Sequence, residues 1–363
     1  MQCIHYLNVG WEDKILLRSN LFKTELLFFI ICLLFGAECS ASEKINFTGE
    51  KLVSQMPNKE NLITHQSEKQ DLTSIVAKLK GRIIRDGDKP DSTVKEQLDL
   101  VDQLMNFELG RFLLTNRGLN GVWTRYIVLY PKRRNEMVRM GQSLIGLEKW
   151  MLERAPVMRA TQERFTHFQS LLQENVRSHM KLASVPCGMM DDLLTLNLSN
   201  YSDVKLVGID LDDASLEGAK TTAIKLNLGA KTSFIKSDAW QLNALNEFDI
   251  MTSNGLNIYE PNDAKVVELY KNFYLALKPG GILVTSFLTP PLALSPESPW
   301  NLEKIDPEDL RLQKVIFSYI LSIKWQSYRT EKQTLQQLKS AGFKNIRIIY
   351  DQAKTFPTVV AKK

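Results

Sequence analysis

The 363-residue sequence has little that would mark a metal-binding or disulfide-stabilised protein. Its four cysteines show no CxxC spacing, and its four histidines form no HxxxH or HExxH pattern. These absences argue against a zinc knuckle, a disulfide scaffold and a metal site. The formal net charge is only +5, and the one tight basic cluster is Lys132 to Arg134. A solvated surface accounts better for this charge than a nucleic-acid partner does.

The first 43 residues contain an apolar run, Leu26 to Ala37, that suits the core of a signal peptide. The run is too short to span a bilayer comfortably, Glu25 abuts it, and Glu38 before Cys39 disfavours a lipoprotein cleavage site. Two interpretations stay open. One is export or membrane contact through Leu26 to Ala37, and the other is a mis-chosen start codon or a cytoplasmic apolar helix.

Polar composition predicts a linker with at most one short helix over residues 44–92, and helical spacing then predicts a small all-helical cap over 93–180. One helix is expected from Leu98 to Leu113, a second over Asn135 to Glu153, and a third over Arg159 to Val176. A glycine-broken turn after the first helix carries Trp123, Arg125 and Tyr126. These side chains either bind the substrate or pack at the junction between cap and sheet.

From residue 181 to 363 the pattern alternates between strand, loop and helix, which is typical of a doubly wound α/β sheet. Seven strands are expected, mostly parallel, and the last two form an antiparallel hairpin. The turn KPGG, Lys278 to Gly281, is expected to open the fifth strand. The predicted strands are LASV (182–185), KLVGID (205–210), TSFIKSDA (232–239), FDIMTSNG (248–255), GILVTSFL (281–288), FKNIRIIYD (343–351) and TFPTVVAKK (355–363).

Loops or carboxylates follow four of these strands, and in a parallel sheet they would meet at one edge. The first strand runs into PCGMM, the second ends at Asp210, the third ends in SDAW, and the fourth ends in SNG. Asp210 follows Gly188 by about twenty residues, the interval typical of a nucleotide-binding unit. A carboxylate accepts hydrogen bonds from two vicinal ribose hydroxyls, since it is acceptor-only and bidentate.

This ordered series resembles the class I, Rossmann-like S-adenosylmethionine-dependent methyltransferases. The first loop departs from the family pattern because it has one glycine, Gly188, and Ser184 in the place of an acid. The resemblance implies S-adenosylmethionine as cofactor and a methyl acceptor that we expect to be a small molecule. It implies these cofactor-binding residues: Pro186, Cys187, Gly188, Met189, Asp210, Leu211, Asp238, Ala239, Trp240, Asn254 and Gly255.

Methyl transfer from a sulfonium is an in-line displacement, so a dedicated general base is needed only when the acceptor arrives protonated. The segment after the fourth strand supplies the catalytic candidates Asn254, Tyr259 and Glu260, together with Asn257 as a substrate-binding candidate. A role for Glu260 as a helix-capping residue is an alternative. A non-catalytic relative that binds cofactor or a partner protein is the second hypothesis for the chain. Cofactor supply favours a cytoplasmic location.

Overall fold

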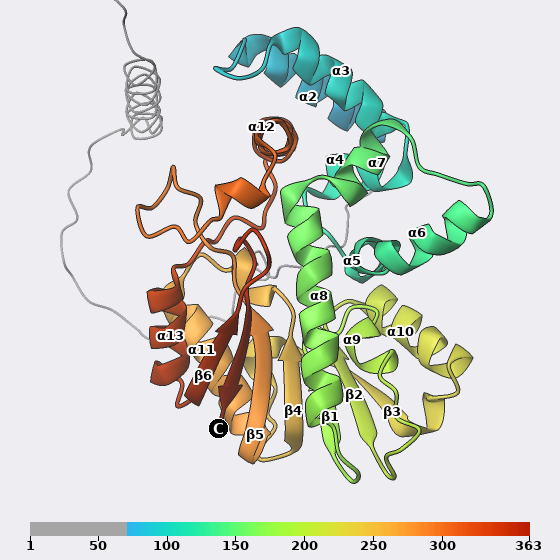
Figure 1. Ribbon diagram of the computed structural model, residues 1–363, viewed down its shortest axis with the longest axis vertical. Coiled ribbons are helices and arrows are strands. Elements are labelled where there is room, and N and C mark those ends of the chain that lie inside the picture. The colour runs from blue at the N-terminus through green and yellow to red at the C-terminus, as the bar shows by residue number, and fades with distance from the viewer. Residues whose placement is uncertain (1–70) are drawn as a thin grey trace, which may run out of the picture. The chain divides into compact units, whose positions relative to one another are not determined.

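Seven strands form one sheet in the computed structural model, which describes residues 71–363 (Figure 1). The order is β3-β2-β1-β4-β5-β7-β6, and β7 alone runs against its neighbours. This confirms the predicted doubly wound, mostly parallel sheet with a C-terminal antiparallel hairpin. The strands are β1 (Lys181–Ser184), β2 (Lys205–Asp210), β3 (Thr232–Lys236), β4 (Phe248–Ser253), β5 (Leu277–Ser286), β6 (Lys344–Ile349) and β7 (Thr358–Lys362).

Helices cover both faces of this sheet. On one face, α8 (Pro156–Asn175), α9 (Asp191–Leu194) and α10 (Asp213–Lys225) bury the apolar side chains of β1 and β2. On the other, α11 (Asp263–Ala276) and α13 (Glu331–Ser340) bury those of β4, β5 and β7. Strand order reverses between β1 and β4, so the ligand crevice of such a sheet is expected beyond their carboxyl ends.

The helices that follow the strands start at side chains able to accept backbone hydrogen bonds. Asp212 accepts from the N–H groups of Ala214 and Ser215 at the start of α10, and Asn262 does the same for α11. Thr330 and Gln333 form a reciprocal capping box at the start of α13. Each cap satisfies N–H groups that the helix itself leaves without partners, which fixes where each helix begins.

A helical unit precedes β1 and is completed by residues that follow β5. Its apolar core combines side chains from before residue 160 with Ile316, Phe317, Ile320 and Trp325. We had expected the segment around residues 316–325 to belong with the sheet, but it packs inside the helical unit. The helices are α2 (Leu72–Asp86), α3 (Val94–Met105), α4 (Glu108–Asn116), α5 (Gly121–Val128), α6 (Tyr130–Arg139), α7 (Gly146–Glu153), α12 (Pro307–Lys314) and the π-helical η6 (Val315–Ile320).

The helical unit begins earlier than residue 93. Helix α2 lies within the range 44–92, for which a linker with at most one short helix was predicted, and its Ile83 is buried in the same core. Arg82 also donates to the carbonyl oxygen of Tyr319, at 2.9 Å, so α2 is bonded to η6. The apolar run Leu26 to Ala37 and the linker up to residue 70 lie outside the described residues. Within residues 71–363, no helix has the length and apolarity to span a bilayer.

Two glycine-rich segments differ from their predicted form. The single helix expected over Asn135 to Glu153 is two helices, α6 and α7, because the chain turns at Gly141 and Gly146, whose φ angles are 69° and 58°. The predicted turn KPGG lies inside β5, where it forms an irregularity opposite β4. A Cβ atom at Gly281 would lie 3.0 Å from the Asp249 carbonyl oxygen, so the close approach of these strands requires glycine.

Helix α5 joins the helical unit to the sheet unit. Arg125 forms an ion pair with Asp191 of α9, at 3.0 Å, and donates to Thr222 Oγ1 of α10, also at 3.0 Å. Asp191 is buried, and this burial raises the pKa of its carboxyl to about 7, although Arg125 opposes the shift.

Gly110, in the first turn of α4, provides a test of how α4 packs against the end of α3. A Cβ at Gly110 would lie 2.1 Å from the Leu104 carbonyl oxygen, whereas one at Gly81 of α2 would meet only Arg85 Nη1, at 3.5 Å. We expect Gly110→Ala to lower the free energy of unfolding by about 1–3 kcal/mol through overpacking. Gly81→Ala should raise it by about 0.5–1 kcal/mol through helix propensity. Urea denaturation measures both, and equal effects of the two substitutions would contradict this packing.

The buried Asp191 predicts a pH dependence of stability. Its pKa is about 7 in the folded protein against 3.8 for an ordinary aspartate, so between these values the folded state holds a proton that the unfolded chain has lost. Stability therefore falls as pH rises through this window, by at most about 1.4 kcal/mol per pH unit. Asp191→Asn removes this titration, so the stability of the variant relative to the unaltered protein should rise from pH 5 to pH 7.

Urea denaturation at several pH values checks this expectation. The exposed Asp99 of α3 provides a control, since Asp99→Asn should leave the pH dependence unchanged. Parallel pH profiles for Asp191→Asn and the unaltered protein would show that Asp191 is charged throughout this range.

Candidate functional site

The predicted cofactor residues follow β1, β2, β3 and β4, and the parallel strands bring them to one edge of the sheet. Backbone hydrogen bonds fix the loop after β1 against its neighbours. Val185 N–H donates to the Thr252 carbonyl of β4, at 2.8 Å, and Cys187 N–H donates to the Ile209 carbonyl of β2, at 2.9 Å. The loop therefore lies across the strands where the sheet order reverses.

Asp210 lies beside this loop and is held by it. The Gly188 N–H donates to Asp210 Oδ2, at 2.8 Å, and the Asp212 N–H donates to Oδ1, at 3.0 Å. Burial raises the pKa of Asp210, while these backbone hydrogen bonds act in the opposite direction. A carboxylate oxygen has two lone pairs, so both oxygens retain capacity to accept from a ligand. The side chain is thus oriented in advance at the carboxyl end of β2.

Two side chains of the first loop pack into the protein. Cys187 is buried, and burial raises the pKa of its thiol well above the usual range, which excludes a reactive thiolate. The thioether of Met189 lies against α10, where a Cβ at Gly218 would approach its Sδ to 2.6 Å. Cys187 and Met189 therefore anchor the loop, while the Gly188 backbone follows a left-handed turn with φ of 49°.

Gly121 of α5 makes a close contact that the sequence analysis missed. A Cβ on Gly121 would lie 2.8 Å from Gly188 Cα, so the helical unit touches the loop after β1 backbone to backbone. The loop has fewer glycines than is usual for such a fold, and here a glycine of the neighbouring helix permits the approach. The signal in the sequence was Gly121 itself, which we interpreted as a helix breaker although it starts α5.

The side chains that follow β3 already form some hydrogen bonds with neighbouring backbone groups. Asp238 Oδ1 accepts from the Trp240 N–H, at 2.9 Å, and so caps the short helix η3 (Ala239–Gln241). The Trp240 indole N–H donates to the Lys265 carbonyl of α11, at 2.8 Å. This bond ties the indole to α11, and Asp238 stays at the carboxyl end of β3 beside β2.

The segment after β4 contains a buried side-chain oxygen that can still accept a hydrogen bond, and the loop that follows it is held by several hydrogen bonds. Asn254 Oδ1 is buried and has no hydrogen-bond partner within residues 71–363. Asn257 Nδ2 donates to the Tyr270 hydroxyl, at 3.0 Å. The buried Arg329 donates to the carbonyl oxygens of Asn257 and Glu260, at 2.9 and 2.6 Å, so its guanidinium fixes the course of this loop.

The other two catalytic candidates occupy different surroundings. Burial raises the pKa of Tyr259 to about 12, while the Leu119 backbone and Arg164 oppose the shift, so the hydroxyl is protonated at neutral pH. Glu260 Oε1 accepts from the Asn262 N–H, at 2.8 Å, immediately before α11. The helix-capping alternative thus accounts for the placement of Glu260.

Three of the predicted substrate residues make contacts within the helical unit or with α9 and α10. The Trp123 ring lies 5.7 Å from that of Phe112 and 5.4 Å from that of Tyr126, centre to centre. The Tyr126 hydroxyl donates to Glu148, at 2.7 Å. Arg125 is the ion-pair partner of Asp191. Arg125 thus lies at the junction between the helical unit and the sheet unit, whereas Trp123 and Tyr126 contact other side chains of the helical unit. None of these contacts involves Asn257.

Arg164 is a second residue that the sequence analysis missed. It belongs to the buried stripe of α8, and its Nη1 donates to Ser286 Oγ at the end of β5, at 3.3 Å. Its guanidinium carbon lies 3.7 Å from the centre of the Phe356 ring. Helical spacing could have indicated that Arg164 is buried, because it precedes the buried Phe168 by four positions and therefore lies on the same face of the helix.

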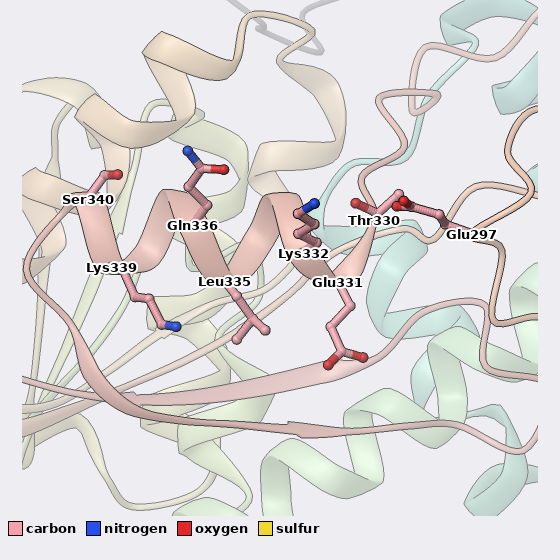
Figure 2. A pocket seen from close by; sticks show the side chains of 8 residues that line it. All are labelled: Glu297, Thr330, Glu331, Lys332, Leu335, Gln336, Lys339 and Ser340. Carbon is pink, nitrogen blue, oxygen red and sulfur yellow. The ribbon is translucent and has the colours of Figure 1, made fainter.

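An open hollow of about 770 Å³ lies along α13 (Figure 2). Its side chains are mostly charged or polar, and none is a predicted cofactor-binding residue. The hollow is lined by Glu297, Thr330, Glu331, Lys332, Leu335, Gln336, Lys339 and Ser340. Within residues 71–363, no group of three His, Cys, Asp or Glu side chains is arranged to hold a metal ion.

Comparison with known proteins gives matches of two kinds. The family described as a methyltransferase domain matches residues 185–281. Sterol 24-C-methyltransferase of Candida albicans is 30% identical over 110 residues, which are 30% of this chain and 28% of that protein. The enzyme of the same name from Debaryomyces hansenii is 30% identical over 125 residues, which are 34% of this chain and 30% of that protein. The chain thus matches less than a third of these relatives' length.

A solved structure matches over most of the chain. It is described as a possible exported protein from Bordetella parapertussis and is 45% identical, with a TM-score of 0.75. The match covers 80% of this chain and 95% of that one, so the two proteins share sheet and helical unit alike. The methyltransferase-domain match spans the strands that carry Gly188 and Asp210, so residues 185–281 form a methyltransferase domain of the class I, S-adenosylmethionine-dependent type.

Proposed function

We propose that this protein transfers a methyl group from S-adenosylmethionine to a small-molecule acceptor by in-line displacement. The observation that carries the proposal is the Asp210 carboxylate, which two backbone N–H groups hold at the carboxyl end of β2. In a sheet whose order reverses between β1 and β4, this is where a ribose would lie. Asp210 would accept from both ribose hydroxyls through the lone pairs that its backbone bonds leave free.

The other residues of this edge fit the remaining parts of the cofactor. The loop with Gly188 presents its backbone to the methionyl part, and Asp238 would accept from the exocyclic amine of adenine. The buried Asn254 Oδ1, which has no hydrogen-bond partner in the described part of the chain, lies after β4 on the acceptor side of this arrangement. An unpaired buried acceptor is costly, so a donor on the cofactor or acceptor would lower the free energy of the complex relative to the free protein.

The cofactor, when bound, supplies a methyl group on a positively charged sulfur and so needs no protein nucleophile. The chain's task is to hold the acceptor in line and to exclude water. The Tyr259 hydroxyl stays protonated because its pKa is about 12, so it can donate a hydrogen bond but is a poor base. Glu260 is engaged at the start of α11. Asn254 is therefore the residue best placed to orient the acceptor's nucleophilic group.

The acceptor side is largely apolar. Ile258, Leu288 and Phe356 of the sheet unit share one buried cluster with the core of the helical unit. An acceptor with an apolar body would fit beside this cluster, and the curated relatives act on sterols by their names. These observations support a small acceptor of lipid-like or aromatic character.

A second candidate is a relative that binds the cofactor without catalysing transfer. The contact of Gly121 with Gly188 favours it, because α5 lies directly on the loop that would receive the methionyl part. The two candidates differ in methyl transfer and agree on cofactor binding.

Calorimetric titration with S-adenosylhomocysteine tests the part that both candidates share. We expect the unaltered chain to bind this product, and Asp210→Asn to weaken binding by about 10–100-fold, because each hydrogen bond to a charged acceptor contributes about 1.5–3 kcal/mol. Asp203→Asn, at the opposite end of β2, is the matched control and should bind normally. If the unaltered chain does not bind S-adenosylhomocysteine, both candidates fail.

Methyl-labelled S-adenosylmethionine and a cell extract then separate the two candidates. We expect label to appear in a small molecule and Asn254→Ala to reduce the rate while cofactor binding persists. Binding without transfer would favour the second candidate.

We also propose that the protein acts in the cytosol, where the cofactor is made, although the Bordetella relative is described as possibly exported. Cell fractionation should find the full chain, and a chain without residues Met1 to Ala41, in the same compartment. Recovery of a shortened form outside the cytosol would instead identify Leu26 to Ala37 as an export signal.

A further inference from the structure

Arg164 is a buried positive charge that forms no ion pair within residues 71–363, although the charge of Asp351 acts on it at longer range. Its side chain lies in the middle of α8 with 3% of its surface exposed. Nη1 makes one long hydrogen bond, to Ser286 Oγ, and the buried Nε has no partner within residues 71–363. Burial lowers the pKa of this guanidinium to about 9, which still leaves it charged at neutral pH. Such a group destabilises a fold unless something pairs with it.

Two neighbouring carboxylates form no ion pair with Arg164 within residues 71–363, and each accepts backbone hydrogen bonds from other residues. Asp351 acts on Arg164 electrostatically, but its Oδ1 accepts from the Thr355 N–H and its Oδ2 from the Phe356 N–H, at 3.1 and 2.7 Å. Glu163, the preceding residue on α8, accepts from the Gln352 N–H, at 2.8 Å, and pairs weakly with Arg159. In the part of the chain that the structure describes, this desolvated guanidinium therefore has no carboxylate within ion-pair distance.

The position of Arg164 is on the acceptor side of the proposed site. It contacts Ser286 at the end of β5 and Phe356 before β7. Gly255, directly after β4, leaves room for it, because a Cβ there would lie 3.2 Å from Nη1. Asp210 and the loop with Gly188 follow β2 and β1, on the other side of β4 in the strand order. Figure 1 shows α8 lying lengthwise in front of the strands, from the helical unit down the sheet, and the bond to Ser286 places Arg164 at the end of β5.

The geometry of the guanidinium limits what can bind it. The Phe356 ring covers one of its flat faces, and its N–H edge is the part that can donate hydrogen bonds to a ligand. A planar carboxylate can accept two parallel hydrogen bonds from that edge, and its single negative charge balances the single positive charge of the guanidinium. A phosphate would bring close to two charges to a single buried cation. The apolar Ile258 and Phe356 nearby suit the uncharged body of such a ligand.

We propose that Arg164 binds a carboxylate group of the methyl acceptor, so that the substrate is an organic acid with an apolar body. This inference rests on the proposed function, since it names the substrate class of the same site. The ion pair anchors one end of the acceptor beside β5, and Asn254 orients the group that receives the methyl.

Two pairs of probes test this assignment: octanoate with octanamide, and phenylacetate with phenylacetamide. Each is titrated into the full chain with S-adenosylhomocysteine present, and binding is followed by ligand-observed NMR. At least one acid should bind about tenfold or more tightly than its amide, because the amide cannot form the ion pair. Arg164→Gln should abolish that preference, and Arg164→Lys should keep part of it. Arg159→Gln, on the exposed side of the same helix, should keep all of it.

Several outcomes would overturn the proposal. One is equal binding of acid and amide by the unaltered chain, and another is failure of both acids to bind. Loss of S-adenosylhomocysteine affinity in Arg164→Gln would assign the guanidinium to the cofactor instead. If the unaltered chain binds no S-adenosylhomocysteine, that result contradicts the proposed function but not the role of Arg164. The acids and amides are then compared on the protein without S-adenosylhomocysteine.

Thermal melting separates this role from a structural one. Because the unpaired charge is costly, Arg164→Met should melt at the same temperature as the unaltered protein or higher. A fall in melting temperature for Arg164→Met, Arg164→Gln and Arg164→Lys alike, but not for Arg159→Gln, would show that the guanidinium serves the fold.

Discussion

The hydrogen bond from the Gly188 N–H to the Asp210 carboxylate joins the two strand ends on which the rest of the site depends. It holds the loop after β1 against β2, and it directs the carboxylate along the edge of the sheet where strand order reverses. The close contact of Gly121 then places α5 on this loop. Arg125 secures that contact through Asp191 and Thr222, so the geometry of the cofactor edge and the docking of the helical unit are set together.

The part of the fold that follows from local patterns could be predicted from the sequence. Alternating strands and helices with short loops specify a parallel sheet, and Asp210 is identifiable because it ends a buried strand. The helical unit could not be predicted in the same way, because its core pairs Ile83 with residues more than two hundred positions later, such as Phe317. Periodicity shows that a face is buried but not which distant segment buries it.

The residues of the candidate site also differ in whether local sequence patterns predict their positions. Gly188, Asp210, Asp238 and Asn254 come from strand ends, so their chain positions alone place them at one edge. Arg164 reaches that edge from a helix, and Trp123 and Tyr126, which look like ligand-binding aromatics in the sequence, pack against Phe112 and bond to Glu148. Side-chain direction and tertiary contacts decide such cases, and neither is encoded in residue type or local spacing.

The two-part construction of the helical unit also sets an order of assembly during synthesis. Helices α2 to α7 leave the ribosome long before α12 and η6, which complete their apolar core. Until then the side chains that await Ile316, Phe317 and Trp325 face solvent, because the whole sheet up to β5 must be made first. The unit therefore reaches its final packing only when more than four-fifths of the chain exists, which makes it dependent on the methyltransferase sheet that it covers.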